Sequence, residues 1–91
     1  MVSNGVDVRL CGEDVERGTF SHRHCVINDQ EIDLKKHTPI NSVAAAHSKF
    51  VAANSHLSEL GVLGFEYGVT LADPDAHVIW EAQFGDFANG A

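Results

Sequence analysis

One carboxylate stands at a position where a catalytic group can be held. Glu59 directly follows Ser58, a residue type that favours the cap of a helix. Its side chain therefore falls in a first helical turn, where negative charge is electrostatically favoured. With apolar Leu57 and Leu60 nearby, the carboxylate is either solvated or buried beside a ring nitrogen, where it could donate a hydrogen bond in catalysis. The residues alone leave both interpretations open.

A second candidate is the segment 18–25, Gly-Thr-Phe-Ser-His-Arg-His-Cys, which contains side chains that bind metals or act as nucleophiles. On a helix, His22 and His24 would point to different faces, and no second ligand pair follows. A Cys25 nucleophile would need a neighbouring histidine, which the sequence cannot place. We therefore expect no metal site, and we expect Cys11 and Cys25, which form no CxxC pair, to be reduced thiols that pack in the interior.

Three glycines, Gly61, Gly64 and Gly68, interrupt the helix that Ser58 would begin. Each costs about 1 kcal/mol relative to alanine, so their presence needs a compensating reason. Spacings of three and four residues put them on one face. That face predicts close packing within the domain or at a subunit interface, with a cofactor-facing role as the alternative.

The segment 80–87, Trp-Glu-Ala-Gln-Phe-Gly-Asp-Phe, leaves a predicted strand through polar and aromatic residues. Ligands of α/β folds bind at the carboxyl ends of parallel strands. Phe84 and Phe87 could close a flat pocket there or belong to the core. Neither GxxxxGKS nor GxGxxG occurs, so a diphosphate would have to be held elsewhere.

Hydrophobic patterning predicts an alternation of strands and helices along the chain. Such an alternation is typical of an α/β fold with a layered, mostly parallel sheet and flanking helices. The expected elements are a strand over 6–10, a helix over 14–27, a connector over 31–49 with an extended piece at 38–41, a strand over 50–53, a helix from 58 to 71 or 72, a buried strand over 76–80 and a further helix from 83 to 91.

Composition excludes several classes of protein. Of the 91 residues, 6 are Lys or Arg and 13 are Asp or Glu, giving a net charge of −7, which argues against nucleic-acid binding. No run approaches the roughly 18 apolar residues of a membrane span. The amino terminus has neither secretory nor mitochondrial targeting character. Because the last residues open a helical pattern without completing it, we expect a chain cut from a longer one.

Four blocks of the sequence resemble the decarboxylating component of the 2-oxoglutarate dehydrogenase family. They occur in the same order as in that family and cover most of the chain. The blocks are CGEDVERGTFSHRH at 11–24, HTPIN at 37–41, LSELGVLGFEYG at 57–68 and WEAQFGDFANGA at 80–91. The resemblance implies that residues 1–91 are part of a transketolase-like pyrimidine-binding domain, truncated at both ends.

The resemblance also implies roles for particular residues. Glu59 would hydrogen-bond the aminopyrimidine ring of thiamine diphosphate and favour the tautomer that generates the reactive ylide. Leu57 and Gln83 would line the cofactor pocket, and Phe87 would lie against the pyrimidine. His22 and His24 would approach the mouth of the site without an assigned role. The magnesium and diphosphate motif is absent, so another domain would hold magnesium.

The parent enzyme implied by the resemblance decarboxylates 2-oxoglutarate in the tricarboxylic acid cycle. It passes the succinyl group to a lipoyl-bearing transferase and works as a homodimer, in the mitochondrial matrix of eukaryotes or the bacterial cytoplasm. The alternatives are the related 2-oxoadipate enzyme and a non-catalytic truncated product that only associates with the full subunit. The isolated chain is expected to be inactive.

Overall fold

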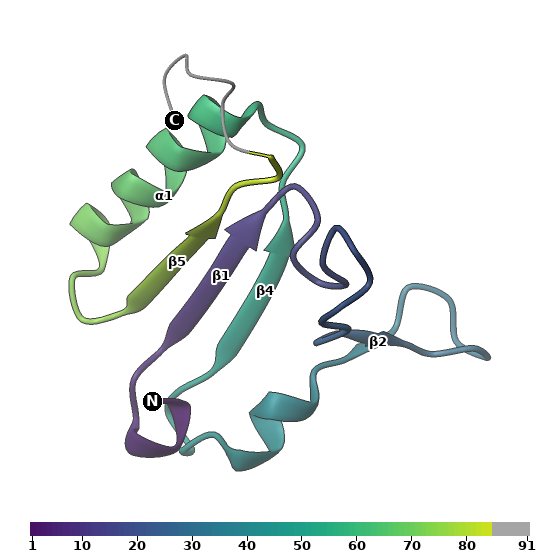
Figure 1. Cartoon of the computed structure of the whole chain (residues 1–91). Helices are drawn as coiled ribbons and strands as arrows, with labels where there is room; N and C mark the ends of the chain where they lie inside the picture. Colours follow the sequence, from purple (N-terminus) through teal and green to yellow (C-terminus); the bar gives the residue numbers. More distant parts are fainter. Residues whose placement is uncertain (85–91) are drawn as a thin grey trace.

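A three-stranded parallel sheet forms the centre of the molecule. In the computed structural model, which describes residues 1–84, β1 (Val8–Gly12) lies between β4 (Phe50–Asn54) and β5 (His77–Glu81), as Figure 1 shows. The registers pair Val8 with Phe50 on one side and with His77 on the other. The carboxyl ends of all three strands therefore meet at one edge of the sheet. The expected α/β class with a parallel sheet is confirmed.

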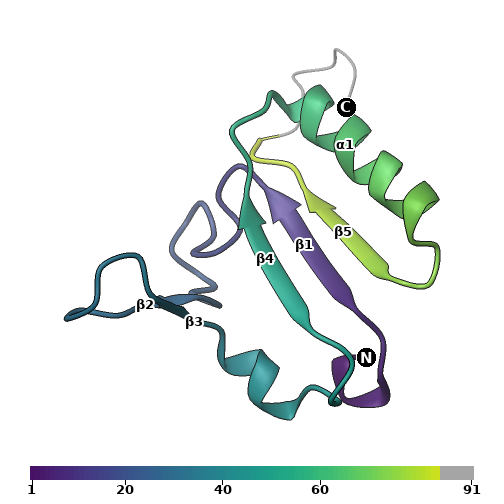
Figure 2. The same cartoon turned by 180° about the vertical axis from the view of Figure 1, so that it is seen from behind.

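One helix, α1 (Glu59–Ala72), connects β4 to β5 and packs against β5 and β1 (Figure 2). It begins as expected, because the Ser58 hydroxyl oxygen accepts a hydrogen bond from the Gly61 N–H at 3.2 Å. It ends where the Asp73 N–H donates to the Val69 carbonyl, just before Pro74. The strand and helix predictions for 50–53 and 58–72 are confirmed to within one residue.

The face that α1 buries differs from the glycine face. Val62 and Glu66 are the buried residues of the helix, whereas a Cβ added to Gly64 or Gly68 would meet open space. Gly64 and Gly68 thus point outward, so packing among the described residues does not explain them, whereas a Cβ on Gly61 would lie 3.1 Å from the Ser58 hydroxyl oxygen. Three large apolar side chains, Leu60, Tyr67 and Leu71, are exposed on this outward side.

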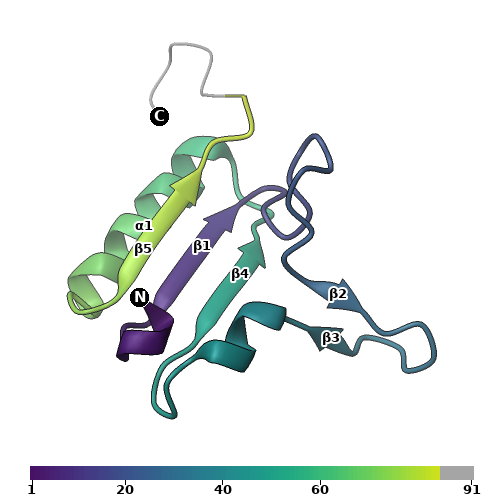
Figure 3. The same ribbon diagram turned by 60° about the horizontal axis from the view of Figure 1, so that its bottom comes forward.

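The connection from β1 to β4 contains no α-helix, so the prediction of a helix over 14–27 is wrong. Gly18, Ser21 and His24 have φ values of 84°, 55° and 49°, which a right-handed helix cannot contain. The segment forms turns and then a small antiparallel hairpin of β2 (Ile27–Asn28) and β3 (Lys36–His37). This hairpin extends away from the sheet (Figure 3). The charges in this segment suit a helix dipole, but they are not sufficient to form a helix. The apolar residues here are too sparse to bury one helical face.

Two short 3-10 helices, η1 (Val2–Asn4) and η2 (Pro39–Val43), complete the connections near the start of the strands. Thr38 is extended, as expected of a residue before proline, but the expected extended piece at 38–41 does not continue. Pro39 instead occupies the first helical turn, where its missing N–H costs nothing.

The expected buried strand forms as β5, but it is not buried. Val78 and Trp80 are half-buried while His77 and Ile79 are exposed, Ile79 at 38%. Within residues 1–84, β5 is an edge strand with α1 on only one face, so its other face stays open. Of the helix predicted from 83 to 91, Gln83 and Phe84 form a bend and the rest lies outside the described residues.

Candidate functional site

Three chain segments converge at the carboxyl edge of the sheet: the turns after β1, the start of α1 and the residues after β5. Close backbone contacts hold them together. A Cβ on Gly12 would lie 2.5 Å from the Glu81 carbonyl oxygen and 2.7 Å from Val15 Cγ1, so only glycine fits there. The Ser55 N–H donates to the Gly12 carbonyl at 2.7 Å. This edge is where α/β folds bind ligands.

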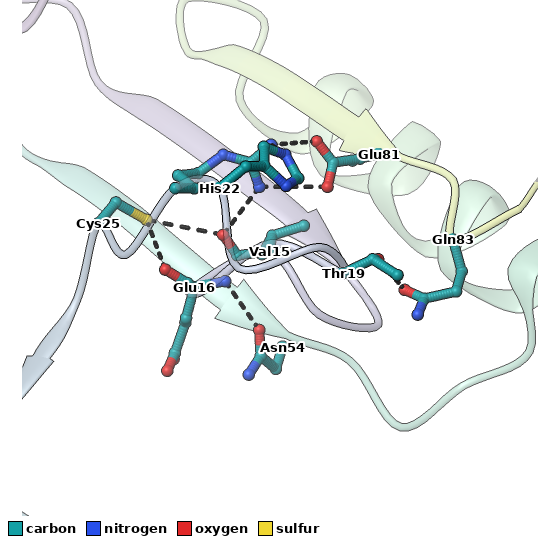
Figure 4. A network of polar contacts seen from close by, with 9 residues as sticks. Val15, Glu16, Thr19, His22, Cys25, Asn54, Glu81 and Gln83 are labelled. Atoms are coloured by element: carbon teal, nitrogen blue, oxygen red, sulfur yellow. Dashed lines mark hydrogen bonds and ion pairs between the residues drawn. The ribbon is translucent and has the colours of Figure 1, made fainter.

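Arg23 ties the segment after β1 to the end of β5. Its Nη1 donates to the Val15 carbonyl at 2.9 Å and to Glu81 Oε1 at 3.1 Å, and its Nη2 donates to Glu81 Oε2. The hydrogen bond to Glu81 raises the pKa of Arg23, so the guanidinium stays charged. Figure 4 shows this network of polar contacts around Val15 and Glu81. The ion pair fixes two segments that are 58 residues apart in the sequence.

Glu59 lies at this edge with its two carboxylate oxygens in different environments. Oε1 accepts a hydrogen bond from the backbone N–H of Gln83 at 2.6 Å. Oε2 is shielded from solvent, and no residue of the described part of the chain gives it a hydrogen bond. Buried polar atoms in native proteins nearly always have a partner, so this oxygen is available to a polar partner outside residues 1–84.

Gln83 is held on its other side by the turn segment. The Thr19 hydroxyl donates to Gln83 Oε1 at 2.9 Å, as Figure 4 shows. Phe20 and Phe84 meet edge to face beside this contact, with ring centroids 6.5 Å apart, and both rings are largely exposed. The structure therefore brings two of the predicted site residues, Glu59 and Gln83, into direct contact.

Of the other two predicted site residues, the structure describes only Leu57. Leu57 is 48% exposed and lines a neighbouring groove of about 360 Å³ together with Arg9, Cys11 and Phe65. Phe87 lies outside the described residues. The assigned roles of all four residues in binding a cofactor stay predictions.

Among the sequence candidates, the two histidines are exposed and the two cysteines are buried. His22 and His24 lie on exposed turns, and a Cβ on Gly18 would lie 2.6 Å from the His22 ring. Cys11 and Cys25 are free and buried, as expected, and burial raises the pKa of each thiol. The Cys25 thiol also donates to the Glu16 carbonyl at 3.3 Å, an arrangement that disfavours a thiolate nucleophile.

Sequence analysis missed a buried ion pair between β1 and α1. Arg9 Nε and Nη2 donate to Glu66 Oε2 and Oε1 at 2.8 and 2.9 Å. The Phe65 ring lies 5.8 Å from the Arg9 guanidinium carbon. A charged residue in the otherwise apolar run from Leu60 to Leu71 was the available signal, because a buried charge needs a partner.

Two kinds of feature are absent from the part of the chain that the structure describes. Residues 1–84 contain no cluster of three or more His, Cys, Asp or Glu side chains with the geometry of a metal site. None of the helices in the same range has the length and apolar character needed to cross a membrane.

Comparison with known proteins identifies relatives over the whole chain. Residues 1–91 match the family model described as transketolase, pyrimidine binding domain. The 2-oxoglutarate dehydrogenase, mitochondrial, of Caenorhabditis briggsae is 54% identical over all 91 residues. So are the 2-oxoglutarate dehydrogenase-like, mitochondrial, protein of Pongo abelii and the 2-oxoglutarate dehydrogenase E1 component of Rickettsia felis, each at 54%.

The chain covers only 9% of the length of each of these three relatives. Its own 91 residues are nevertheless matched from end to end. The chain therefore belongs to the transketolase pyrimidine-binding domain family.

Proposed function

We propose that this chain is part of the E1 component of a 2-oxoglutarate dehydrogenase and forms half of a thiamine diphosphate site. The observation that carries the proposal is the divided environment of Glu59. One oxygen is held by the Gln83 N–H, and the other is buried and unpaired within residues 1–84, at the carboxyl edge of a parallel sheet. A pyrimidine ring nitrogen is a suitable partner for that free oxygen.

The residues present fit the pyrimidine end of the cofactor. Glu59 Oε2 would share a proton with the ring, and Gln83, held by Thr19, would line the pocket beside it. Leu57 and Phe87 would supply apolar contact to the flat ring. When bound, thiamine diphosphate supplies the carbanion chemistry that decarboxylates a 2-oxo acid.

The contribution of this chain would be to hold the pyrimidine ring and to orient the Glu59 carboxylate toward it. Glu59 sits in the first turn of α1, and the backbone N–H of Gln83 fixes the direction of its carboxylate. Water exclusion around Oε2 strengthens any hydrogen bond made there. The carboxylate can therefore hold a proton at Oε2 or release it to the ring without moving.

The remaining functions belong to parts of the protein beyond this segment. Magnesium and the diphosphate would be held by another domain, across a homodimer interface. The succinyl group from 2-oxoglutarate would pass to the lipoyl-bearing succinyltransferase component. We propose a mitochondrial matrix location for a eukaryotic source and a cytoplasmic one for a bacterial source. The isolated chain, which would be a partial domain, would be inactive.

The test uses the complete subunit that carries this sequence, loaded with thiamine diphosphate and magnesium. We expect Glu59→Gln to slow deuterium exchange at C2 of the bound cofactor by about a hundredfold or more, because the amide cannot accept and return the proton. Glu31→Gln, on the exposed hairpin, is the matched control and should exchange at the wild-type rate.

An exchange rate in Glu59→Gln equal to that of the wild type would contradict the proposal. Assaying the wild-type subunit with both 2-oxoglutarate and 2-oxoadipate distinguishes the two substrates. Faster turnover of 2-oxoadipate would contradict the assignment to 2-oxoglutarate.

A further inference from the structure

A line of two hydrogen bonds connects the turn segment after β1 to the carboxylate of Glu59. The Thr19 hydroxyl donates to the side-chain oxygen Oε1 of Gln83 at 2.9 Å, and the backbone N–H of Gln83 donates to Glu59 Oε1 at 2.6 Å. The three residues come from three separate segments. Gln83 is the only one of them that contacts both of the others.

The contact with Thr19 determines which end of the Gln83 amide remains for a ligand. An amide side chain has one accepting oxygen and one donating nitrogen. Thr19 occupies the oxygen, and within residues 1–84 no acceptor contacts Nε2. The Gln83 side chain would therefore present the N–H donors of Nε2 to a ligand. Glu59, which is bonded to the backbone N–H of Gln83, would present Oε2 as an acceptor or a proton donor.

Thr19 is itself held in place by the turn around it. Arg17 Nη1 donates to the Thr19 carbonyl at 3.3 Å and to the Ser21 hydroxyl at 2.8 Å. Beyond it, the Arg23–Glu81 ion pair attaches the turn to the end of β5, two residues before Gln83. The hydroxyl and the amide are thus anchored from both sides, which is the condition for a precise orientation.

We propose that Thr19 is a positioning residue: it orients the Gln83 amide so that its N–H donors and the free oxygen of Glu59 face the ligand together. The inference rests on the proposed function, because the ligand is the aminopyrimidine end of thiamine diphosphate. Thr19 acts on the ligand through Gln83 and makes no contact with the ligand itself. A chemically matched ligand would offer an acceptor to Gln83 and a ring nitrogen to Glu59.

The experiment compares three variants of the complete subunit in the presence of magnesium. Thr19→Val keeps the shape of the side chain but removes its hydroxyl, and Thr19→Ser keeps the hydroxyl. Thr70→Val removes a comparable hydroxyl bond, from Thr70 to the Tyr67 carbonyl at 2.7 Å, in the body of α1. The measurements are the dissociation constant of thiamine diphosphate, C2 proton exchange at saturating cofactor and the melting temperature.

We expect Thr19→Val to bind the cofactor about fivefold more weakly and to slow exchange by a similar factor, as one lost hydrogen bond predicts. Thr19→Ser should restore both values to within about twofold of the wild type, and Thr70→Val should leave both unchanged. Wild-type binding and exchange in Thr19→Val would overturn the inference. So would a lowered melting temperature in that variant without a change in binding or exchange.

The two proposals fail in distinguishable ways. If Glu59→Gln blocks exchange while Thr19→Val behaves as the wild type, the proposed function stands and the positioning role is wrong. If Glu59→Gln exchanges normally, the proposed function is wrong, and the role assigned to Thr19 is overturned with it.

Discussion

Two glutamates on the same helix have opposite relations to their surroundings. Glu59 and Glu66 are seven residues apart on α1, two turns of one helical face, so both point toward the sheet. Glu66 is 2% exposed and has both oxygens paired with Arg9. Glu59 has one oxygen bound to the Gln83 N–H and the other left free among the described residues.

The difference separates a carboxylate whose two oxygens both join one element to another from a carboxylate that has one oxygen left for a further partner. Both oxygens of Glu66 are bonded to the Arg9 guanidinium, so Glu66 serves to join α1 to β1. A buried carboxylate oxygen without a hydrogen-bond partner costs free energy, because it has lost its contact with water. A ligand that donates a hydrogen bond to this oxygen could offset that cost. Glu59 lies between Ser58 and Leu60 and Glu66 between Phe65 and Tyr67, and these neighbours do not indicate which of the two carboxylates is paired with a cation.

The largest expected effect on stability comes from removing the charge of Glu66. Glu66→Gln should lower the free energy of unfolding by about 3 kcal/mol, because it leaves the Arg9 guanidinium without a counter-charge. The Arg9 side chain is 29% exposed, which keeps the loss at the lower end for buried pairs. Urea denaturation of this chain and its variants measures the effect.

Glu59→Gln is the matched comparison in the same denaturation series. The amide still accepts the Gln83 N–H, so we expect a loss below about 1 kcal/mol. Equal losses for the two variants would remove the distinction drawn between the two glutamates.

The second prediction concerns replacement of the whole ion pair. The double variant Arg9→Met with Glu66→Leu should recover about 2 kcal/mol relative to Glu66→Gln, because no buried charge then remains unpaired. The single variant Arg9→Met should be as unstable as Glu66→Gln. Strictly additive losses in the double variant would show that the two side chains do not act as a pair.

A smaller effect on the free energy of unfolding is expected when the pH is lowered. Burial acts to raise the pKa of Glu66, but the hydrogen bonds from Arg9 and Cys11 and the positive charge of Arg9 together outweigh burial and hold the pKa below its ordinary value of 4.5. The stability contributed by this group is therefore complete above pH 4.5 and is lost as the pH falls through the lower folded-state pKa. Denaturation midpoints below pH 5 should depend less on pH in Glu66→Leu with Arg9→Met than in the wild type. An unchanged pH dependence would contradict the assignment.

The smallest effect tests the face of α1 opposite both glutamates. A Cβ on Gly64 meets open space, so Gly64→Ala should stabilise this chain by about 1 kcal/mol through helix propensity alone. Gly61→Ala should stabilise it less, since its Cβ would lie 3.1 Å from the Ser58 hydroxyl oxygen. Thermal unfolding measures both. Destabilisation by Gly64→Ala would show that the glycine face is packed.

Local signals predicted the elements that are built from short-range patterns. Ser58, the apolar run after it and the Asp73-Pro74 stop predicted the bounds of α1. Alternation of apolar and polar residues predicted a strand over 6–10, and β1 forms two residues later, at Val8–Gly12. The prediction of a helix over 14–27 was wrong because the conformation of this segment depends on distant partners such as Glu81 and Gln83. The acidic side chains near the start of this segment and the basic ones later in it, which favour a helix, influence its conformation less than those tertiary contacts.

By itself the sequence determined the α/β class, the position of Glu59 in the first turn of a helix and the resemblance to a known family. These depend on residue type and on spacing of a few positions. Only the tertiary structure decided that Glu66 is paired, that Glu59 is half-paired, and that Thr19 reaches Glu59 through Gln83. Hydrogen-bond partners across 24 to 64 residues are chosen by how the strands align, and no local pattern records that alignment.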